Sequence, residues 1–340
     1  MALYAFDGTG DAWDQESLIT PTTKTKNDRY LTNVVFFYKE YIESGLQAEY
    51  LPGVGSATRL TNRIIGGAFG LGARGVVNNA FDKLKAHYKN GDRVIDIVGY
   101  SRGAAIARAF ADKTFQDYAQ LIDNNGHPLI EPPEIRFIGL FDTVASFGSP
   151  LNDNELLFQE RIPKTAKYTF HAMSLDVRKI GFGLDRAYGE NVLEVWFRGG
   201  HGDIGGNSTL SDGSPNRSRT NIALNFMLKK ARAAGIELRE PTNYPMDIKA
   251  PVVIDGNSET LDEDPSRQYR NHDIFHHSIF DASGQEISFP GCVELPERSQ
   301  LVIEELDNES QLSELRLLQL TPELAKRYPD TASIYRKLYQ

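Results

Sequence analysis

The pentapeptide Gly-Tyr-Ser-Arg-Gly at residues 99–103 limits the fold of this chain more than any other part of its sequence. It follows an apolar segment at 93–98, which favours a buried strand, and it precedes an alanine-rich segment that favours a helix. A serine in G-x-S-x-G at a strand-to-helix turn forms a nucleophile elbow. Gly99 and Gly103 lack Cβ atoms, so strand and helix can pack closely there. We therefore predict that Ser101 is a nucleophile; the alternative is a tight turn without chemistry.

The chain around this motif alternates between strand-like and helix-like segments, which predicts parallel strands joined by helical crossovers. Strands are expected at 2–6, 48–51, 93–98, 135–141 and 193–197. Helices are expected at 33–43, 102–114 and 221–234, and a glycine-rich stretch at 66–75 leads into another that ends near 88. The expected fold class is α/β, with an α/β-hydrolase-like, mostly parallel sheet covered by helices on both faces.

The domain organisation is expected to be simple. The 340 residues contain no flexible linker, which favours a single domain over residues 1–340. Residues 150–190 and 239–272 do not fit the alternation and are candidate insertions that could form a cap or lid. Short strands are expected within 288–303, and a helix is expected from 322 onward.

Composition excludes several function classes. The net charge of −9 argues against a general nucleic-acid binder. The single cysteine, Cys292, excludes an internal disulfide framework. The first residues lack the features of a signal peptide, and no apolar run approaches the length of a membrane span. We expect a cytoplasmic protein, or one that is secreted without a cleaved signal peptide.

A serine nucleophile requires a histidine base and an acid that orients this base. Asp142 follows the strand predicted at 135–141, so it is expected at the same sheet edge as Ser101. Asp203 is the alternative acid, in the glycine-rich turn after the strand at 193–197.

Two positions compete for the base. His201 lies in that glycine-rich turn, where the backbone can approach a substrate closely, and we favour it on this ground. His276, or its neighbour His277, lies later in the chain, where α/β-hydrolases usually carry their histidine. A zinc site built on His201 and Asp203 is less favoured, because two ligands need partners and serine is not a usual zinc ligand. We expect neither a metal nor another cofactor.

The turn Asp-Gly-Thr-Gly at 7–10 follows the first predicted strand. If this strand lies beside the elbow strand, Gly8 or Thr9 could donate a backbone N–H to an oxyanion, opposite the N–H of Arg102. The alternatives are an ordinary turn or a phosphate-binding loop, although the sequence contains no G-x-x-x-x-G-K-[ST] motif.

Seven motifs occur in an order that resembles a known family. They are Phe-Asp-Gly-Thr-Gly at 6–10, Thr-Asn-Val at 32–34, Leu-Pro-Gly-Val-Gly at 51–55, Gly-Tyr-Ser-Arg-Gly at 99–103, Phe-Asp-Thr-Val-Ala at 141–145, Phe-His-Ala at 170–172, and Val-Trp-Phe with His-Gly-Asp-Ile-Gly-Gly within 195–206. The chain resembles the α/β-hydrolase family that contains the phospholipase effectors of bacterial type VI secretion, of the type 1 lipase class. The similarity covers roughly residues 1–240, with 270–280 as a further candidate segment.

The resemblance implies an α/β-hydrolase fold, a Ser-Asp-His triad and hydrolysis of ester bonds in phospholipids. Ser101 matches the family's nucleophile and Asp142 its acid, whereas His201 and Asp203 match its H-x-D motif. His276 matches an H-x-S pattern that occurs late in many members. The sequence departs from the family at Gly202, where serine is frequent, and at Asn207, where glycine is usual.

Together these observations predict a serine esterase or lipase that acts through an acyl-enzyme. Its substrate is expected to be a small-molecule or lipid ester, reached through transient contact with a membrane surface, without a nucleic-acid partner. The alternatives are a catalytically silent α/β-hydrolase scaffold that binds a ligand or partner, and a metal-dependent hydrolase.

Overall fold

The computed structural model describes residues 1–13, 31–55, 67–146, 161–177, 181–189, 191–239, 244–254, 265–270 and 273–304 of the chain. The helix predicted from residue 322 onward lies outside the described residues, as do parts of both candidate insertions.

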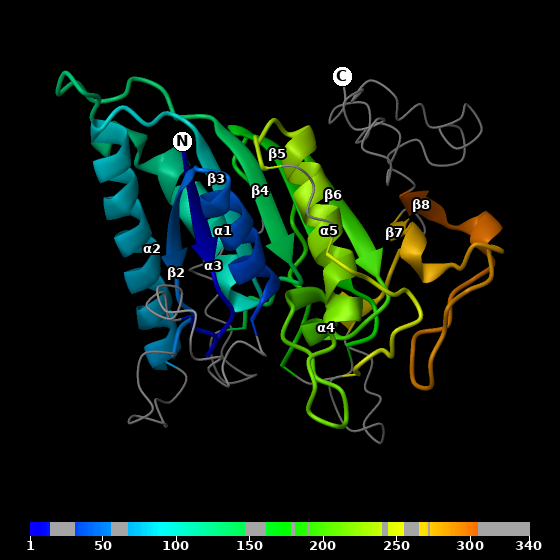
Figure 1. Ribbon diagram of the computed structural model, residues 1–340. Helices are drawn as coiled ribbons and strands as arrows, with labels where there is room; N and C mark the ends of the chain where they lie inside the picture. The colour runs from blue at the N-terminus through cyan, green and yellow to red at the C-terminus, as the bar shows by residue number, and fades with distance from the viewer. Residues whose placement is uncertain are drawn as a thin grey trace.

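A parallel sheet forms the centre of the molecule (Figure 1). Its eight described strands are β1 (Ala2–Phe6), β2 (Gln47–Leu51), β3 (Ile95–Tyr100), β4 (Ile135–Phe141), β5 (Ala166–Ser174), β6 (Val192–Phe197), β7 (Ile274–His276) and β8 (Val302–Glu304). They follow the order β2-β1-β3-β4-β5-β6-β7-β8, and every adjacent pair is parallel. Their carboxyl ends therefore gather along one edge, the lower edge in Figure 1, where α4 also lies.

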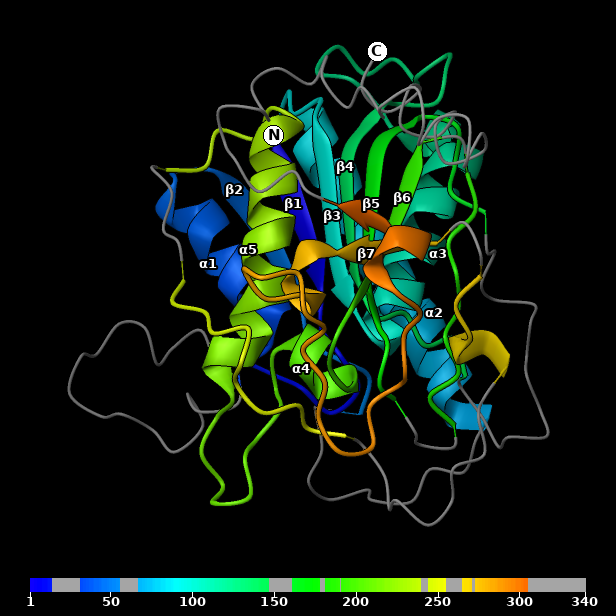
Figure 2. The same ribbon diagram turned by 90° about the vertical axis from the view of Figure 1, so that its right-hand side faces the viewer.

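Helices cover both faces of this sheet (Figure 2). The α-helices are α1 (Asn33–Glu43), α2 (Gly67–Lys89), α3 (Arg102–Gln116), α4 (His201–Gly205) and α5 (Arg217–Ala233). One apolar cluster joins α1 and α5 to one face, and a second joins α2 and α3 to the other. The structure thus has the α/β-hydrolase-like arrangement that the sequence predicts.

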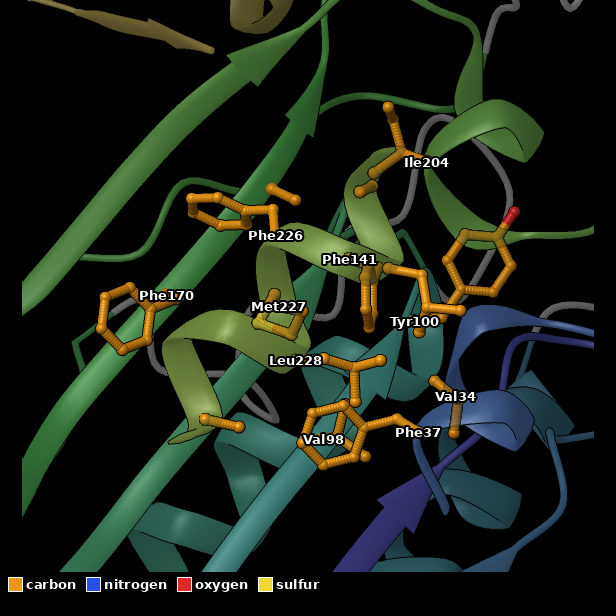
Figure 3. Packing of buried hydrophobic residues seen from close by; sticks show 14 of the residues in the cluster. Val34, Phe37, Val98, Tyr100, Phe141, Phe170, Ile204, Phe226, Met227 and Leu228 are labelled. Atoms are coloured by element: carbon orange, nitrogen blue, oxygen red, sulfur yellow. The ribbon is translucent and has the colours of Figure 1, made fainter. Parts of the chain in front are cut away.

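The core on the α5 side shows how side chains hold the layers together (Figure 3). Met227 and Leu228 of α5 lie among aromatic side chains from the strands, including Phe141 of β4 and Phe170 of β5. All four side chains are at most 2% exposed. Burying a large apolar side chain contributes about 1.5–3 kcal/mol, so this packing fixes α5 and the loop that precedes it.

Sheet order decides which turns meet at the carboxyl edge. β3 lies between β1 and β4, with Phe6 opposite Gly99 and Tyr100 opposite Phe141. The turn after β1 and the residue after β4 therefore flank the residue after β3, which is Ser101. The condition on which the role of the turn at 7–10 depends, that the first strand lies beside the elbow strand, is met.

The structure also corrects several expected elements. Residues 166–174 form β5 in the middle of the sheet, so this part of the candidate insertion at 150–190 belongs to the fold itself. The stretch at 66–75 is largely helical already, because α2 begins at Gly67. Within 288–303, the structure has strand only at 302–303, the start of β8.

Candidate active site

Ser101 lies on a strained turn between β3 and α3. Its backbone has φ 56° and ψ −127°, and it is the residue that directly precedes α3. A Cβ on Gly99 would come within 2.7 Å of Cα of Ala104, and one on Gly103 within 2.2 Å of the carbonyl oxygen of Asp7. The two glycines thus permit the close packing that the motif predicts, and Ser101 stands at the N-terminus of a helix.

His201 contacts both Ser101 and Asp142. Its Nε2 is 2.8 Å from Oγ of Ser101, and its Nδ1 is 2.5 Å from Oδ2 of Asp142. The three residues come from the turn after β3, the turn after β4 and the first position of α4. Ser101 is 4% exposed, His201 5% and Asp142 0%. The geometry matches that of a nucleophile, a base and an acid that fixes the base.

Two aromatic rings hold the His201 imidazole from different sides. The ring of Tyr100 lies 4.9 Å from it in a tilted arrangement, and the ring of Phe182 lies 4.8 Å from it at 82°. Tyr100 reaches this position because Gly205 has no side chain: a Cβ there would lie 2.0 Å from the Tyr100 ring. The glycine-rich segment around His201 therefore allows an aromatic wall to form beside the imidazole.

Asp142 is fixed by three partners and has a positive φ of 43°. Its Oδ1 accepts a hydrogen bond from the Ser174 N–H at 2.8 Å and one from Nη1 of Arg267 at 2.5 Å. Burial by itself raises the pKa of this carboxyl, but Arg267 and His201 outweigh burial and hold the pKa well below its usual value. Asp142 therefore stays ionised beside His201.

Sequence reasoning missed Arg267. It lies within residues 239–272, which the sequence analysis treated only as a candidate insertion. No local motif distinguishes Arg267 from other arginines, since it meets Asp142 across 125 positions of sequence.

His276 occupies a different environment from the one expected of a base. It ends β7, and its ring stacks on Phe197 at 4.4 Å and meets Phe226 edge-on at 5.7 Å. Its Nδ1 is 2.8 Å from Oγ of Ser278. The ring of His277 lies 4.3 Å from that of His276. The structure brings His201 to Ser101 and places His276 in an aromatic cluster, so these contacts favour His201 over His276 as the base.

Asp203 is engaged in holding the backbone around α4. Its Oδ2 accepts hydrogen bonds from the N–H groups of Gly200 and Val253, and its Oδ1 accepts from Ser208 and Asn216. Burial raises its pKa to about 6, although these hydrogen bonds act in the opposite direction. The partner of the His201 imidazole is Asp142, so this contact favours Asp142 over Asp203 as the acid.

The turn after β1 contributes Thr9 to the pocket in which the oxyanion hole is predicted. The Gly8 N–H donates to Oδ1 of Asp7 at 2.8 Å, so in this structure it does not point to a free oxyanion position. Thr9 and Arg102 both line the pocket at Ser101, and no hydrogen bond among the described residues occupies either backbone N–H. These two amides remain the candidates for binding an oxyanion.

A pocket of about 300 Å³ opens above Ser101 and His201. Asp11, Asn207 and Val253 lie in its wall. Nδ2 of Asn207 is 3.3 Å from both carboxyl oxygens of Asp11, and Oδ1 of Asn207 accepts from the Tyr100 hydroxyl at 3.2 Å. Burial, and then the nearby Asp7, raise the pKa of Asp11 to about 8. The departure from the family pattern at Asn207 thus places an amide in the wall of the pocket.

His171 belongs to a buried network behind the acid turn. Its Nε2 accepts a hydrogen bond from the Thr143 N–H at 3.1 Å, and its Nδ1 is 2.9 Å from Oε1 of Glu194. Burial alone raises the pKa of Glu194, but His171 and Arg186 lower it to about 2. Only the pairing of β5 with β6 brings His171 beside Glu194, so no local pattern marks this contact in the sequence.

Two further findings concern sites for other groups. Among the described ranges, no group of three or more His, Cys, Asp or Glu side chains is arranged to hold a metal ion. Within the same ranges, no helix is both long and apolar enough to cross a membrane.

The parallel sheet, the helices on both faces and the elbow define a protein of the α/β-hydrolase fold class. The family model described as "T6SS, Phospholipase effector Tle1-like, catalytic domain" matches residues 3–127 and 113–230, which together cover more than half of the chain. The chain therefore belongs to the family of Tle1-like phospholipase effectors of type VI secretion. Hydrolysis of lipid esters is the activity that this family description implies.

Two solved structures are similar to this chain. An uncharacterized protein from Pseudomonas aeruginosa is 20% identical, with a TM-score of 0.45, over 72% of this chain and 47% of its own length. The Tle1 effector bound to the VgrG spike of the type 6 secretion system is 21% identical, with a TM-score of 0.42, over 61% of this chain and 51% of its own. The chain thus spans about half the length of each. None of the curated proteins matches it.

Proposed function

We propose that this chain is a serine hydrolase that cleaves carboxylic ester bonds of phospholipids. The observation that carries the proposal is the pair of contacts made by His201, 2.8 Å to Oγ of Ser101 and 2.5 Å to Oδ2 of Asp142. The membership of the chain in a phospholipase effector family supports the lipid ester as substrate. Such a substrate requires at least transient contact with a membrane surface.

In the proposed mechanism, Oγ of Ser101 attacks the ester carbonyl carbon while Nε2 of His201 takes the hydroxyl proton. The N–H groups of Thr9 and Arg102 stabilise the negative charge that develops on the carbonyl oxygen. The C–O bond to the leaving alcohol then breaks, and His201 returns its proton to this alcohol. Water repeats the sequence on the acyl-enzyme and releases the fatty acid and free Ser101.

Asp142 has a defined part in this scheme. Its Oδ2 accepts from Nδ1–H of His201, so that Nε2 carries the lone pair that faces Ser101. It also stabilises the imidazolium that forms when the proton moves. The low pKa of Asp142 supports this role, because an ionised acid cannot give its own proton to the imidazole.

The experiment that tests the proposal combines covalent labelling with turnover. The folded wild-type protein is treated with a fluorophosphonate probe, and its hydrolysis of phospholipid in mixed micelles is followed by mass spectrometry with and without a chelator. We expect labelling at Ser101, release of fatty acid that the chelator does not reduce, and loss of both in Ser101→Ala.

A matched control is Ser278→Ala, which removes another buried serine hydroxyl that contacts a histidine. This variant should retain both labelling and turnover. A folded wild-type protein that is neither labelled nor active would support a silent scaffold. Turnover that persists in Ser101→Ala and stops on chelation would support a metal-dependent hydrolase.

A further inference from the structure

Arg267 connects the two groups that flank the His201 imidazole. It ends the short helix Pro265–Arg267 and is 5% exposed. Its Nη1 donates to Oδ1 of Asp142 at 2.5 Å, whereas its Nε and Nη2 donate to the carbonyl oxygen of Phe182 at 2.9 and 2.6 Å. The planar guanidinium thus spans the proposed triad acid and the residue whose ring packs edge-on against His201.

The segment that carries Arg267 is itself attached to the site. Oγ of Ser266 accepts a hydrogen bond from the Leu184 N–H at 2.8 Å, two residues after Phe182. A buried guanidinium is costly unless it is paired and its donors are satisfied. The contacts to Asp142 and Phe182, with a longer one of 3.4 Å from Nη1 to the carbonyl oxygen of Ser174, provide that pairing, so Arg267 and these partners have to keep one mutual arrangement.

We propose that Arg267 is a positioning residue for the hydrolysis, which fixes Asp142 and Phe182 so that His201 stays aligned with Ser101. This inference rests on the proposed function. Arg267 acts through Asp142 and Phe182, and not through the reacting atoms. An error of about 1 Å in the placement of a catalytic group can cost about 100-fold in rate. Loss of the Arg267 contacts to Asp142 and Phe182 should therefore lower kcat.

The charge of Arg267 adds a second, separable effect. The ionisable side chains that line the pocket with His201 are, among the described residues, Asp11 in the loop after β1, Tyr100 on β3 and Arg102 on α3. Asp203 lies two residues after His201 on α4. Arg267 is the cation in direct contact with Asp142. Arg267 is the strongest influence that lowers the pKa of Asp142 against burial, so without it this carboxyl takes up a proton at a higher pH. The acid side of the pH–activity profile should then move to higher pH.

The test compares Arg267→Met with Arg267→Lys, measuring kcat and KM on a soluble short-chain ester between pH 5 and 9. We expect kcat of Arg267→Met to fall by about 10- to 100-fold, with a smaller change in KM and an upward shift of the acid limb. Arg267→Lys keeps the charge but cannot reach both partners with a planar fork. Its acid limb should match the wild type, and its kcat should lie between those of the wild type and Arg267→Met.

The matched control is Lys230→Met, which removes a cation from another buried ion pair. Nζ of Lys230 is 2.8 Å from Oε1 of Glu304, and both side chains are 1% exposed. Lys230 lies near the end of α5 that is remote from the pocket. This variant should unfold at a lower temperature but keep the kcat and the pH profile of the wild type.

Several results would overturn the inference. One is a folded Arg267→Met with wild-type kcat and acid limb, and another is an equal loss of kcat in Lys230→Met. If Arg267→Met does not fold, Arg267→Lys decides, because wild-type kcat in that variant would exclude a positioning role. Failure of the proposed function gives a different result, since wild-type protein would then show no labelling of Ser101.

Discussion

Ser101 and Asp142 directly follow the neighbouring strands β3 and β4, and among the described residues they are the two non-glycine residues with positive φ. Hydrogen bonds hold both: the Ser101 N–H donates to Phe141 and the Asp142 N–H to Ala172, at 3.0 and 2.8 Å. Such conformations cost about 1–3 kcal/mol each and persist only where the surrounding fold enforces them. The strain is therefore concentrated at the two residues that contact His201.

The strain at Ser101 predicts that glycine at this position gives a more stable protein than alanine does. Ser101→Gly and Ser101→Ala both remove the hydroxyl and should both abolish turnover. Glycine tolerates φ 56° and ψ −127°, whereas alanine does not. We expect Ser101→Gly to be more stable than Ser101→Ala by about 1 kcal/mol in urea unfolding. Equal stability of the two variants would show that the elbow is not strained.

The two candidate histidines should respond differently to replacement. His201→Ala should lower kcat by at least about 1,000-fold, because it removes the proposed base. His276→Ala should keep kcat but lower the free energy of unfolding by about 2 kcal/mol, because it leaves a cavity beside Phe197 and Phe226. Steady-state kinetics and thermal unfolding of both variants test this. Loss of kcat in folded His276→Ala would reverse the assignment.

Gly103 at the elbow should tolerate replacement by alanine much less than Gly75 in α2 does. A Cβ on Gly103 would lie 2.2 Å from the carbonyl oxygen of Asp7, so Gly103→Ala should cost about 3 kcal/mol of stability. Gly75 in α2 has open space around it, and Gly75→Ala should add about 0.5–1 kcal/mol. Urea unfolding of the two variants compares them directly. Comparable effects would contradict the described packing.

The raised pKa of Asp11 predicts a pH-dependent stability. The value is about 8 in the folded protein and 3.8 in an unperturbed chain, so the folded state holds an additional proton between these limits. The contribution of Asp11 to stability is therefore complete below about pH 4 and is lost as the pH rises toward 8. Asp11→Asn lacks this loss, and its stability relative to wild type should increase by more than about 1 kcal/mol from pH 5 to pH 8.

The control for this prediction is Asp82→Asn, which changes a carboxyl that is 72% exposed. Urea unfolding at pH 5 and pH 8 should give the same difference from wild type at both values for Asp82→Asn. A difference between Asp11→Asn and wild type that does not change with pH would show that Asp11 ionises normally.

Local patterns in the sequence were sufficient to predict the bounds of several helices and strands. The predicted bounds at 2–6, 33–43 and 135–141 coincide with β1, α1 and β4, because period and flanking turns are local properties. β5 was missed within 150–190, since a buried strand in the middle of a sheet lacks the alternation that marks a half-buried one. β7 spans three residues, which is too short for any pattern to identify it.

The sequence by itself determined the elbow, the parallel fold class and a short set of candidates for acid and base. Only the tertiary structure selected among them, because His201, which contacts Ser101, and Asp142, which contacts His201, lie about 100 and 40 residues from Ser101 in the sequence. Sheet order brings Asp142 and His201 together, whereas His276 stacks on Phe197 and the Gly8 amide turns toward Asp7. Arg267 had no local signature, since its partner becomes its neighbour only when the chain folds.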